Sequence, residues 1–240
     1  MNTKTPPFVF KQFTVKQDRC AMKIGTDGVL LGAWVPLDES ITSILDVGTG
    51  TGVIALMAAQ RSSAAVIDAL EIDADAYEQA VENFESSDWG DRLFCYHASF
   101  QEFFEEIDDQ YDMLISNPPF YKEDYKTKDN KRDLARFEDA LPFTHLFYGA
   151  SILLSDQGQF AIIAPYTEEK NIITIAAKVS LYPKKITRVK GTPSSDIKRS
   201  LFLFSKDEQE CSVDELIIEN SRHDYTEEYI ELTKSYYLKM

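Results

Sequence analysis

The sequence predicts an α/β protein with a mostly parallel sheet that is covered by helices on both faces. From residue 41 to about residue 181, short apolar runs of strand length alternate with amphipathic segments of helical length. Parallel strands need crossover connections, and these are usually helices. Apolar runs such as SILDV (43–47) and YDMLIS (111–116) are typical of strands buried on both faces. Because 44% of the 240 residues are hydrophobic, the chain can build the core that such a sheet needs.

Each element follows from its apolar spacing and from the turn residues at its ends. Residues 8–16 alternate in part between apolar and polar side chains, which predicts a strand or hairpin, and the glycines of 18–34 predict a turn into a helix. The predicted strands are 43–47, 64–72, 92–98, 111–116, 158–165, 184–191, 199–206 and 213–220. The predicted helices are 51–61, 73–85, 99–107, 138–154, 167–181 and 225–237. We expect one domain: an N-terminal extension with a hairpin and a helix (1–40), a core (41–206), and a C-terminal strand and helix (207–240).

Charge alone argues against a phosphate-rich partner. The chain has 25 basic and 40 acidic residues, a formal charge of −15. The basic residues gather, however, at 122–136 and at 184–199, while much of the acid follows residue 206. An acidic solvated surface with scattered basic patches is the plain alternative, but either cluster is large enough to bind nucleic acid locally.

Several classes of protein are not expected. No segment approaches the roughly 20 apolar residues that span a bilayer, and the first residues lack the apolar centre of a signal peptide. We therefore expect a cytoplasmic protein that does not bind membranes. The three cysteines and three histidines lack the paired spacing of a zinc site, so no metal is expected.

The first motif with chemical content is DVGTGTG, which follows the strand at 43–47. Its glycines Gly48, Gly50 and Gly52 form GxGxG, whereas the dinucleotide fingerprint is GxGxxG. The loop is suited to a nucleoside with an amino-acid arm that lies against bare backbone. Glu71 ends the next strand, where a carboxylate can accept hydrogen bonds from both ribose hydroxyls. The plain alternative is a glycine-rich turn and a surface glutamate.

The second motif is NPPF, which follows the strand at 111–116. Both motifs should lie at the carboxyl edge of one sheet, where open α/β sheets bind their ligands. The Asn117 side-chain oxygen and the Pro118 carbonyl can accept hydrogen bonds from both N–H groups of a planar amine, which localises the lone pair of its nitrogen. Phe120 offers a face for stacking. The plain alternative is a turn with two prolines that ends a strand.

Together these motifs resemble the class I S-adenosylmethionine-dependent methyltransferases that act on amino nitrogens. The opening FTVKQDRCAMKIGTDGVLLGAW (13–34) and the ending YTEEYIELTKSYYLKM (225–240) narrow the resemblance to the bacterial tRNA1(Val) (adenine(37)-N6)-methyltransferase family. The resemblance covers nearly the whole chain. It implies a Rossmann-like fold with a mostly parallel seven-stranded sheet, helices on both faces, one antiparallel strand near the C-terminal end and a short N-terminal β-hairpin.

The resemblance also implies roles for individual residues. The residues implied to bind the donor, S-adenosyl-L-methionine, are Lys23, Thr26, Asp27, Asp46, Gly48, Gly50, Glu71, Ile72, Ser99 and Asn117. Those implied to be catalytic, by holding the target adenine, are Asn117, Pro118 and Phe120. Those expected to contact RNA are Pro119, Tyr121, Lys126, Lys128, Lys131, Arg132 and Arg199. After the third strand such enzymes usually present an aspartate to the donor adenine; this chain has Ser99 nearby, which can still hydrogen-bond.

The implied reaction is methyl transfer to N6 of adenine 37 in the anticodon loop of a valine tRNA, with no stable protein partner. A base in a single-stranded loop is splayed out more easily than one in a duplex. The alternatives are methylation of an exocyclic amine in ribosomal RNA, methylation of a protein glutamine, and an inactive donor-binding module that serves as an RNA chaperone. The glutamine enzymes typically carry a helical domain before the glycine motif, and only about 40 residues precede it here. The intact Asn117 and Phe120 argue against the inactive module.

Overall fold

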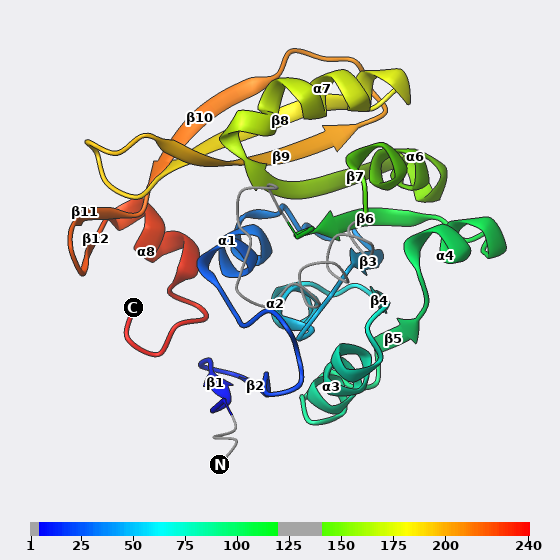
Figure 1. Cartoon of the computed structure of the whole chain (residues 1–240), viewed down its shortest axis with the longest axis horizontal. Helices are drawn as coiled ribbons and strands as arrows, with labels where there is room; N and C mark the ends of the chain where they lie inside the picture. The colour runs from blue at the N-terminus through cyan, green and yellow to red at the C-terminus, as the bar shows by residue number, and fades with distance from the viewer. Residues whose placement is uncertain (1–4, 120–140) are drawn as a thin grey trace, which may run out of the picture.

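One eight-stranded sheet organises the computed structural model, which describes residues 5–119 and 141–240 (Figure 1). In chain order its strands are β3 (Ser43–Val47), β4 (Val66–Glu71), β5 (Leu93–His97), β6 (Tyr111–Ser116), β7 (Leu154–Pro165), β8 (Tyr182–Lys190), β9 (Ile197–Ser205) and β10 (Ser212–Ile217). They lie side by side in the order β10-β8-β9-β7-β6-β3-β4-β5. Of these eight, β9 alone runs antiparallel to the rest. The short connection between β8 and β9 explains this, because a hairpin joins antiparallel strands.

The α/β class, the single antiparallel strand and the N-terminal hairpin are confirmed, but the sheet has eight strands rather than seven. The additional strand is β10, which pairs in parallel with β8 over six residues. Its sequence predicts a strand but does not reveal its partner. Lys185 and Lys190 on β8 form ion pairs with Asp214 and Glu215 on β10, so part of the pairing depends on charges far apart in the sequence.

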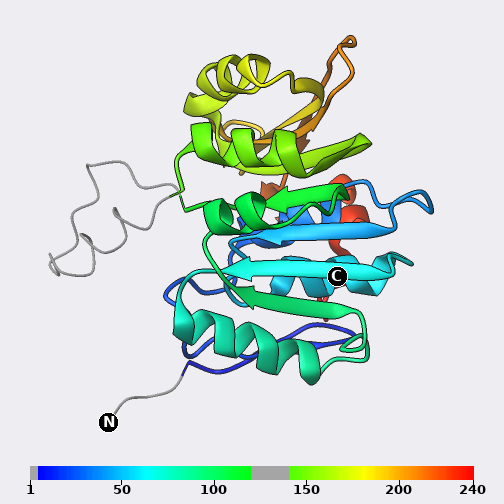
Figure 2. The same cartoon turned by 90° about the vertical axis from the view of Figure 1, so that its right-hand side faces the viewer.

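Helices cover both faces of the sheet (Figure 2). They are α1 (Thr26–Trp34), α2 (Val53–Arg61), α3 (Ala74–Glu85), α4 (Phe100–Glu106), α6 (Phe143–Leu153), the 3₁₀ turn η1 (Tyr166–Glu168), α7 (Glu169–Lys178) and α8 (Glu227–Thr233). The apolar core on one face includes residues of α1, α2, α3 and α8, and the core on the other includes residues of α4, α6 and α7. Successive strand residues enter opposite cores: Ile44 and Met113 the first, Leu45 and Leu114 the second. This alternation explains why the strands are apolar throughout.

Hydrogen bonds through one side chain of α3 join the N-terminal extension to the glycine loop that precedes α2. After β1 (Phe8–Val9) and β2 (Thr14–Val15), the backbone N–H of Lys16 donates to the side-chain oxygen of Asn83, at 2.9 Å. The Asn83 amide donates to the Thr51 carbonyl at 2.8 Å, and Asn83 is fully buried in α3. One buried amide thus joins the extension, α3 and the glycine loop.

A small C-terminal hairpin was not predicted. Strands β11 (Glu219–Ser221) and β12 (Asp224–Tyr225) pair across a turn in which His223 has φ of 65°. The segment is polar and lacks both glycine and an alternating apolar pattern, so it carries none of the usual hairpin signals. None of the described helices is long and apolar enough to cross a membrane.

Candidate active site at the carboxyl edge of the sheet

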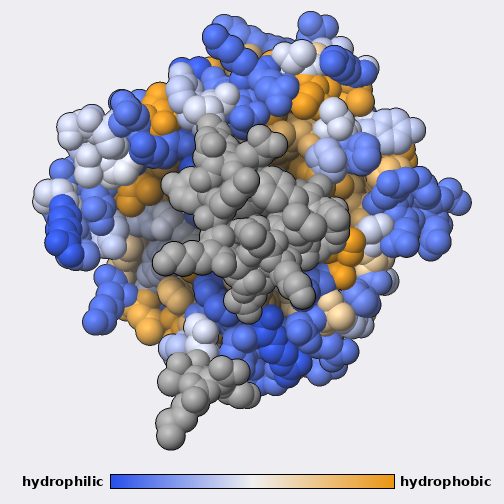
Figure 3. All heavy atoms as spheres, viewed as in Figure 1, coloured by the Kyte–Doolittle hydropathy of each residue, from blue (hydrophilic) through white to orange (hydrophobic). Residues whose placement is uncertain are grey.

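The two motifs leave neighbouring strands at the same level. Val47, the last residue of β3, pairs with Leu70 of β4 on one side and with Ser116, the last residue of β6, on the other. The Ser116 hydroxyl also donates to the Val47 carbonyl at 2.9 Å. The glycine loop and the Asn117 turn therefore begin side by side at the carboxyl edge, which faces the viewer in Figures 1 and 3.

The glycines of the loop serve two different purposes. Gly48, Gly50 and Gly52 all have positive φ, at 72°, 58° and 81°, a conformation that disfavours residues with a Cβ. A Cβ at Gly48 or Gly50 would meet nothing within 4 Å, so these two border open space. A Cβ at Gly52 would lie 2.5 Å from the Phe84 ring. Gly52 is thus required for packing against α3, while Gly48 and Gly50 leave room for a ligand.

Asp46 is buried directly beneath this loop. Its side chain is 1% exposed, and the Thr49 hydroxyl donates to its Oδ2 at 2.5 Å. Burial raises the pKa of its carboxyl to about 7, against the lowering effect of the Thr49 hydrogen bond. Its other oxygen, Oδ1, is buried and makes no hydrogen bond of good geometry among the described residues, although the backbone N–H of Ala55 lies near enough to the carboxyl to lower its pKa. A buried carboxylate oxygen without a donor is costly, and a ligand that donates a hydrogen bond would remove that cost.

Glu71 stands across the loop from Asp46 and is held by backbone groups. Its Oε2 accepts from the N–H of Gly50 at 2.8 Å, and its Oε1 accepts from the N–H groups of Ile72 and Asp73 at 2.9 Å. Burial raises the pKa of Glu71, although these hydrogen bonds oppose it. The carboxylate is thereby fixed at the end of β4, with one lone pair of Oε2 left for a further donor. Ile72 beside it is 49% exposed, an apolar surface next to a polar anchor.

Asn117 faces the beginning of α1. The side chain is half-buried, and a Cβ built on Gly28 would lie 3.6 Å from its Nδ2. One residue earlier in α1, Asp27 accepts a hydrogen bond from the Nε of Arg199 on β9, at 2.7 Å. The first turn of α1 is thus held between the Asn117 turn and the antiparallel strand.

Lys23, Thr26 and Ser99 were also predicted to bind the donor, and each lies in or beside a turn that begins a helix. Lys23 donates from its Nζ to the carbonyls of Gln17 and Cys20, at 2.5 and 2.8 Å, so its ammonium group braces the turn before α1. Thr26 is the exposed first residue of α1. Ser99 is the N-cap of α4: its oxygen accepts from the N–H of Glu102 at 3.2 Å, and its hydroxyl donates to the Glu102 side chain at 2.8 Å. The contact of Ser99 with the donor adenine stays a prediction, and it involves an oxygen that the cap already uses.

The residues predicted to contact RNA are only partly described. Pro118 is buried and Pro119 is exposed directly after Asn117. Phe120, Tyr121, Lys126, Lys128, Lys131 and Arg132 lie outside the described residues. In the second basic cluster, four of the six residues form ion pairs within the protein: Lys185 with Asp214, Arg188 with Glu169, Lys190 with Glu215, and Arg199 with Asp27. Much of the positive charge that the sequence suggests there is therefore neutralised locally.

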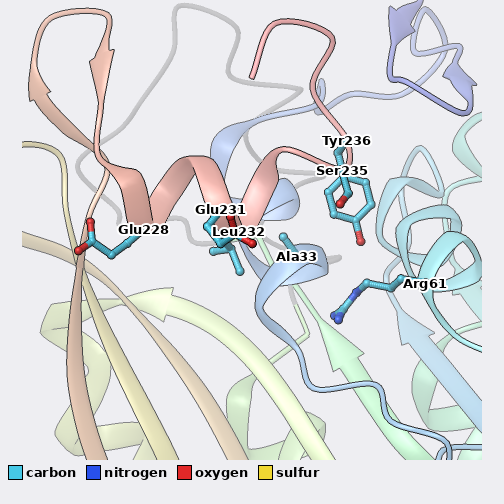
Figure 4. A pocket seen from close by; sticks show the side chains of 7 residues that line it. All are labelled: Ala33, Arg61, Glu228, Glu231, Leu232, Ser235 and Tyr236. Atoms are coloured by element: carbon cyan, nitrogen blue, oxygen red, sulfur yellow. The ribbon is translucent and has the colours of Figure 1, made fainter.

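One cavity among the described residues lies away from the carboxyl edge. A cavity of about 460 Å³ is lined by residues of α1, α2 and α8, including Ala33, Arg61 and Glu231 (Figure 4). Because α1 and α2 begin at the carboxyl edge and the cavity meets their last turns, it opens on the opposite edge. A second cavity, of about 310 Å³, lies beside the end of β5 and is lined in part by Tyr77, His97 and Ala98. Among the described residues, no cluster of three or more His, Cys, Asp or Glu side chains could hold a metal.

Comparison with known proteins identifies the family. The model described as "Methyltransferase small domain" matches residues 28–170. The chain is 63% identical over 234 residues to the tRNA1(Val) (adenine(37)-N6)-methyltransferase of Flavobacterium johnsoniae, which covers 97% of this chain and 100% of that protein. The chain belongs to the tRNA1(Val) (adenine(37)-N6)-methyltransferase family. A more distant member, from Bacteroides fragilis, is 46% identical over 236 residues, which are 98% of this chain and 99% of that one.

Solved structures of other methyltransferases share the fold of this family member. A protein described as a predicted O-methyltransferase from Agrobacterium tumefaciens superposes with a TM-score of 0.69 at 20% identity, over 88% of this chain and 96% of that one. A methyltransferase from Pyrococcus furiosus gives a TM-score of 0.54 at 22% identity, over 75% and 81% of the two chains. At these identities the likeness shows the fold alone.

In this tRNA1(Val) methyltransferase family member, reasoning from the sequence missed two features of the site. One is Gly28, whose missing side chain lets α1 approach Asn117. The other is the pairing of Asp27 with Arg199, which lie 172 residues apart. A glycine in the first turn of a helix is a weak signal of a close approach, and no local pattern reports an ion pair across such a separation.

Proposed function

We propose that this chain transfers the methyl group of S-adenosyl-L-methionine to N6 of adenine 37 in tRNA1(Val), in the cytoplasm. The observation that carries the proposal is the register of β3 and β6, which brings the glycine loop and the Asn117 turn together at one edge. The relatives that match nearly the whole chain have names that specify this reaction. A tRNA is therefore favoured over ribosomal RNA and over a protein glutamine.

The residues at the glycine loop fit the donor. Open space at Gly48 and Gly50 admits a ligand against the backbone, and the fixed carboxylate of Glu71 has a lone pair left for a ribose hydroxyl. The Oδ1 of Asp46, which makes no hydrogen bond of good geometry within the described residues, suits a hydrogen-bond donor on the amino-acid arm. When bound, the donor supplies an electrophilic methyl carbon on a positively charged sulfur. No acid catalyst is then required for the leaving group.

The Asn117 turn supplies what the target amine lacks. The exocyclic nitrogen of adenine is a poor nucleophile because its lone pair is delocalised into the ring. The Asn117 side-chain oxygen and the Pro118 carbonyl accept hydrogen bonds from its two N–H groups. These bonds favour a tetrahedral nitrogen, which localises the lone pair. The proline rings restrict the backbone that carries these acceptors, and the face of Phe120 stacks on the base. Catalysis is then chiefly orientation at an oxygen-lined corner: the methylated nitrogen loses one proton to solvent, and neither a metal nor a general base is needed.

We assign RNA binding mainly to the basic segment 122–136, which follows this turn in the sequence. We assign the phosphate contacts to Lys126, Lys128, Lys131 and Arg132, since most of the second basic cluster is paired internally. Reversing these four charges should lower the affinity for tRNA by about 10-fold or more at moderate salt and reduce the salt dependence of binding. Unchanged affinity would show that the RNA is held elsewhere.

The proposed function is tested by methyl transfer from labelled donor into unmodified tRNA, followed by mass analysis of the nucleosides. The wild-type protein should form N6-methyladenosine at position 37. Asn117→Ala should lower turnover by roughly 10²-fold or more, the size of effect seen when one oriented hydrogen-bonding group is lost, while the donor affinity stays nearly constant. Asn220→Ala, on the exposed hairpin strand β11, is the matched control and should retain full activity. Label in both Asn117→Ala and wild type, or in neither, contradicts the proposal, as does label in ribosomal RNA or protein alone.

A further inference from the structure

An exposed aromatic ring backed by a guanidinium group lies at the carboxyl edge, at the end of β7. Tyr166 directly follows β7, begins the turn η1, and is 37% exposed. The guanidinium carbon of Arg188 lies over its ring, 5.6 Å from the ring centroid. A guanidinium group at this distance is attracted by the aromatic face and covers one side of it. The ring remains partly open to solvent.

The arginine of this pair is held by buried groups. Its Nε and one terminal nitrogen donate to the two carboxylate oxygens of Glu169, at 3.2 and 2.7 Å. Glu169 is 8% exposed and also accepts from the hydroxyl of Ser200, which is fully buried in β9, at 2.7 Å. Burial would raise the pKa of Glu169, but the hydrogen bonds from Arg188 and Ser200 outweigh it and hold that pKa below its ordinary value. A bidentate pair on a buried carboxylate gives the guanidinium plane one orientation.

This pair lies at the same edge of the sheet as the Asn117 turn. Strand β7 pairs its Ile162 with Ser116, the last residue of β6, and continues for three more residues to Pro165. Pro165 pairs with Arg199, whose side chain reaches the first turn of α1 beside Asn117. Tyr166 follows Pro165 immediately and begins η1, so it lies at the same edge of the sheet, after a strand that extends beyond the end of β6.

We propose that Tyr166, braced by Arg188, is the stacking platform for an unpaired base that neighbours the target adenine. The inference rests on the proposed function and names the part of the RNA that this surface receives. Bases in single-stranded loops are recognised by stacking on aromatic rings and on guanidinium planes. Splaying adenine 37 into the site removes its stack from both neighbours, and the Tyr166 ring replaces one of those contacts. The Glu169 and Ser200 hydrogen bonds hold the platform in place before RNA arrives.

The test compares three substitutions of one residue with a control. Tyr166→Ala and Tyr166→Leu remove the ring, Tyr166→Phe keeps it, and Tyr148→Ala removes an exposed ring on α6. The readouts are KM for unmodified tRNA, KM for donor, and direct affinity for fluorescent anticodon-loop RNA. Tyr166→Ala and Tyr166→Leu should raise the RNA KM by about 5- to 150-fold, the loss of one base stack, with little change in kcat or in the donor KM. Tyr166→Phe and Tyr148→Ala should stay within about 2-fold of wild type.

A second experiment identifies the base. RNA with an abasic site at position 36 or at position 38 should weaken binding to wild type, and at one of these two positions it should remove the difference between wild type and Tyr166→Ala. Equal RNA affinity of wild type, Tyr166→Ala and Tyr166→Leu overturns the platform, and so does a difference that persists at both abasic positions. The affinity measurement does not depend on turnover. Wild type that binds RNA through Tyr166 without methylating it would overturn the proposed function and leave the platform standing.

Discussion

The donor half and the substrate half of the candidate site are built in different ways. The donor half, which comprises Asp46, the loop at 48–52 and Glu71, comes from two neighbouring strands and 26 consecutive residues, and backbone N–H groups hold its carboxylate. The substrate half combines Asn117 with the start of α1, with Arg199 on β9 and with Tyr166 after β7. Under the proposed function, the residues of the donor pocket are encoded locally in the sequence, whereas the surface that receives the acceptor depends on tertiary packing.

In the donor half, the largest effect is expected from substitution of Gly52, because this glycine packs against Phe84 whereas Gly48 borders open space. Gly52→Ala should lower the free energy of unfolding by about 2–5 kcal/mol, because it combines a left-handed conformation with overlap on Phe84. Gly48→Ala has the same backbone requirement but open space around its Cβ, so it should lose about 1–2 kcal/mol. The affinity of Gly48→Ala for the donor should fall about 10-fold or more, because the alanine side chain enters the space assigned to the donor. Urea unfolding measures the free energy of unfolding, and calorimetric titration measures the donor affinity. Equal free energies of unfolding for Gly52→Ala and Gly48→Ala, with unchanged donor affinity, would contradict the distinction between these glycines.

A smaller effect is expected from the titration of Asp46. Its pKa is raised from 3.8 to about 7 in the folded protein, so between these values the native state holds a proton that the unfolded chain has released. The contribution of Asp46 to the free energy of unfolding should therefore fall as pH rises from about 4 to 7, with a slope no steeper than about 1.4 kcal/mol per pH unit. Asp46→Asn cannot titrate, so the stability of wild type relative to this variant should decline across that window and level off above it. A difference that is flat with pH would mean that Asp46 is ionised throughout.

The smallest effect sharpens the substrate half. Asp27→Asn and Arg199→Gln should each lower kcat/KM for tRNA several-fold, because each releases the first turn of α1 from β9. The double variant should be little worse than either single one, with a coupling of about 0.5–1 kcal/mol for a pair that is about one-third exposed. If Arg199 instead contacts phosphate directly, the two losses will add, and Arg199→Gln alone will reduce the salt dependence of RNA binding.

The part of the fold that local patterns control could be predicted from the sequence. The strand–loop–helix at 43–61 and the acidic residue that ends β4 follow from apolar runs, glycines and spacing within about 30 residues. The sequence does not predict the pairing of β10 with β8 or the ion pairs of Lys185 and Lys190, because the partners lie too far away in the sequence for any local pattern. Gly52 shows the same limit inside a motif: its spacing suggests a ligand-binding glycine, and its contact with Phe84 assigns it to packing.

The central claim is that both halves serve a single reaction on one tRNA position. Its most direct test is mass mapping of modified nucleosides in tRNA1(Val) from cells that lack this protein, complemented with wild type or with Asn117→Ala. The account predicts that N6-methyladenosine at position 37 disappears in the deleted cells, returns with wild type, and stays absent with Asn117→Ala. Persistence of the modification in deleted cells, or its return with Asn117→Ala, would contradict the account.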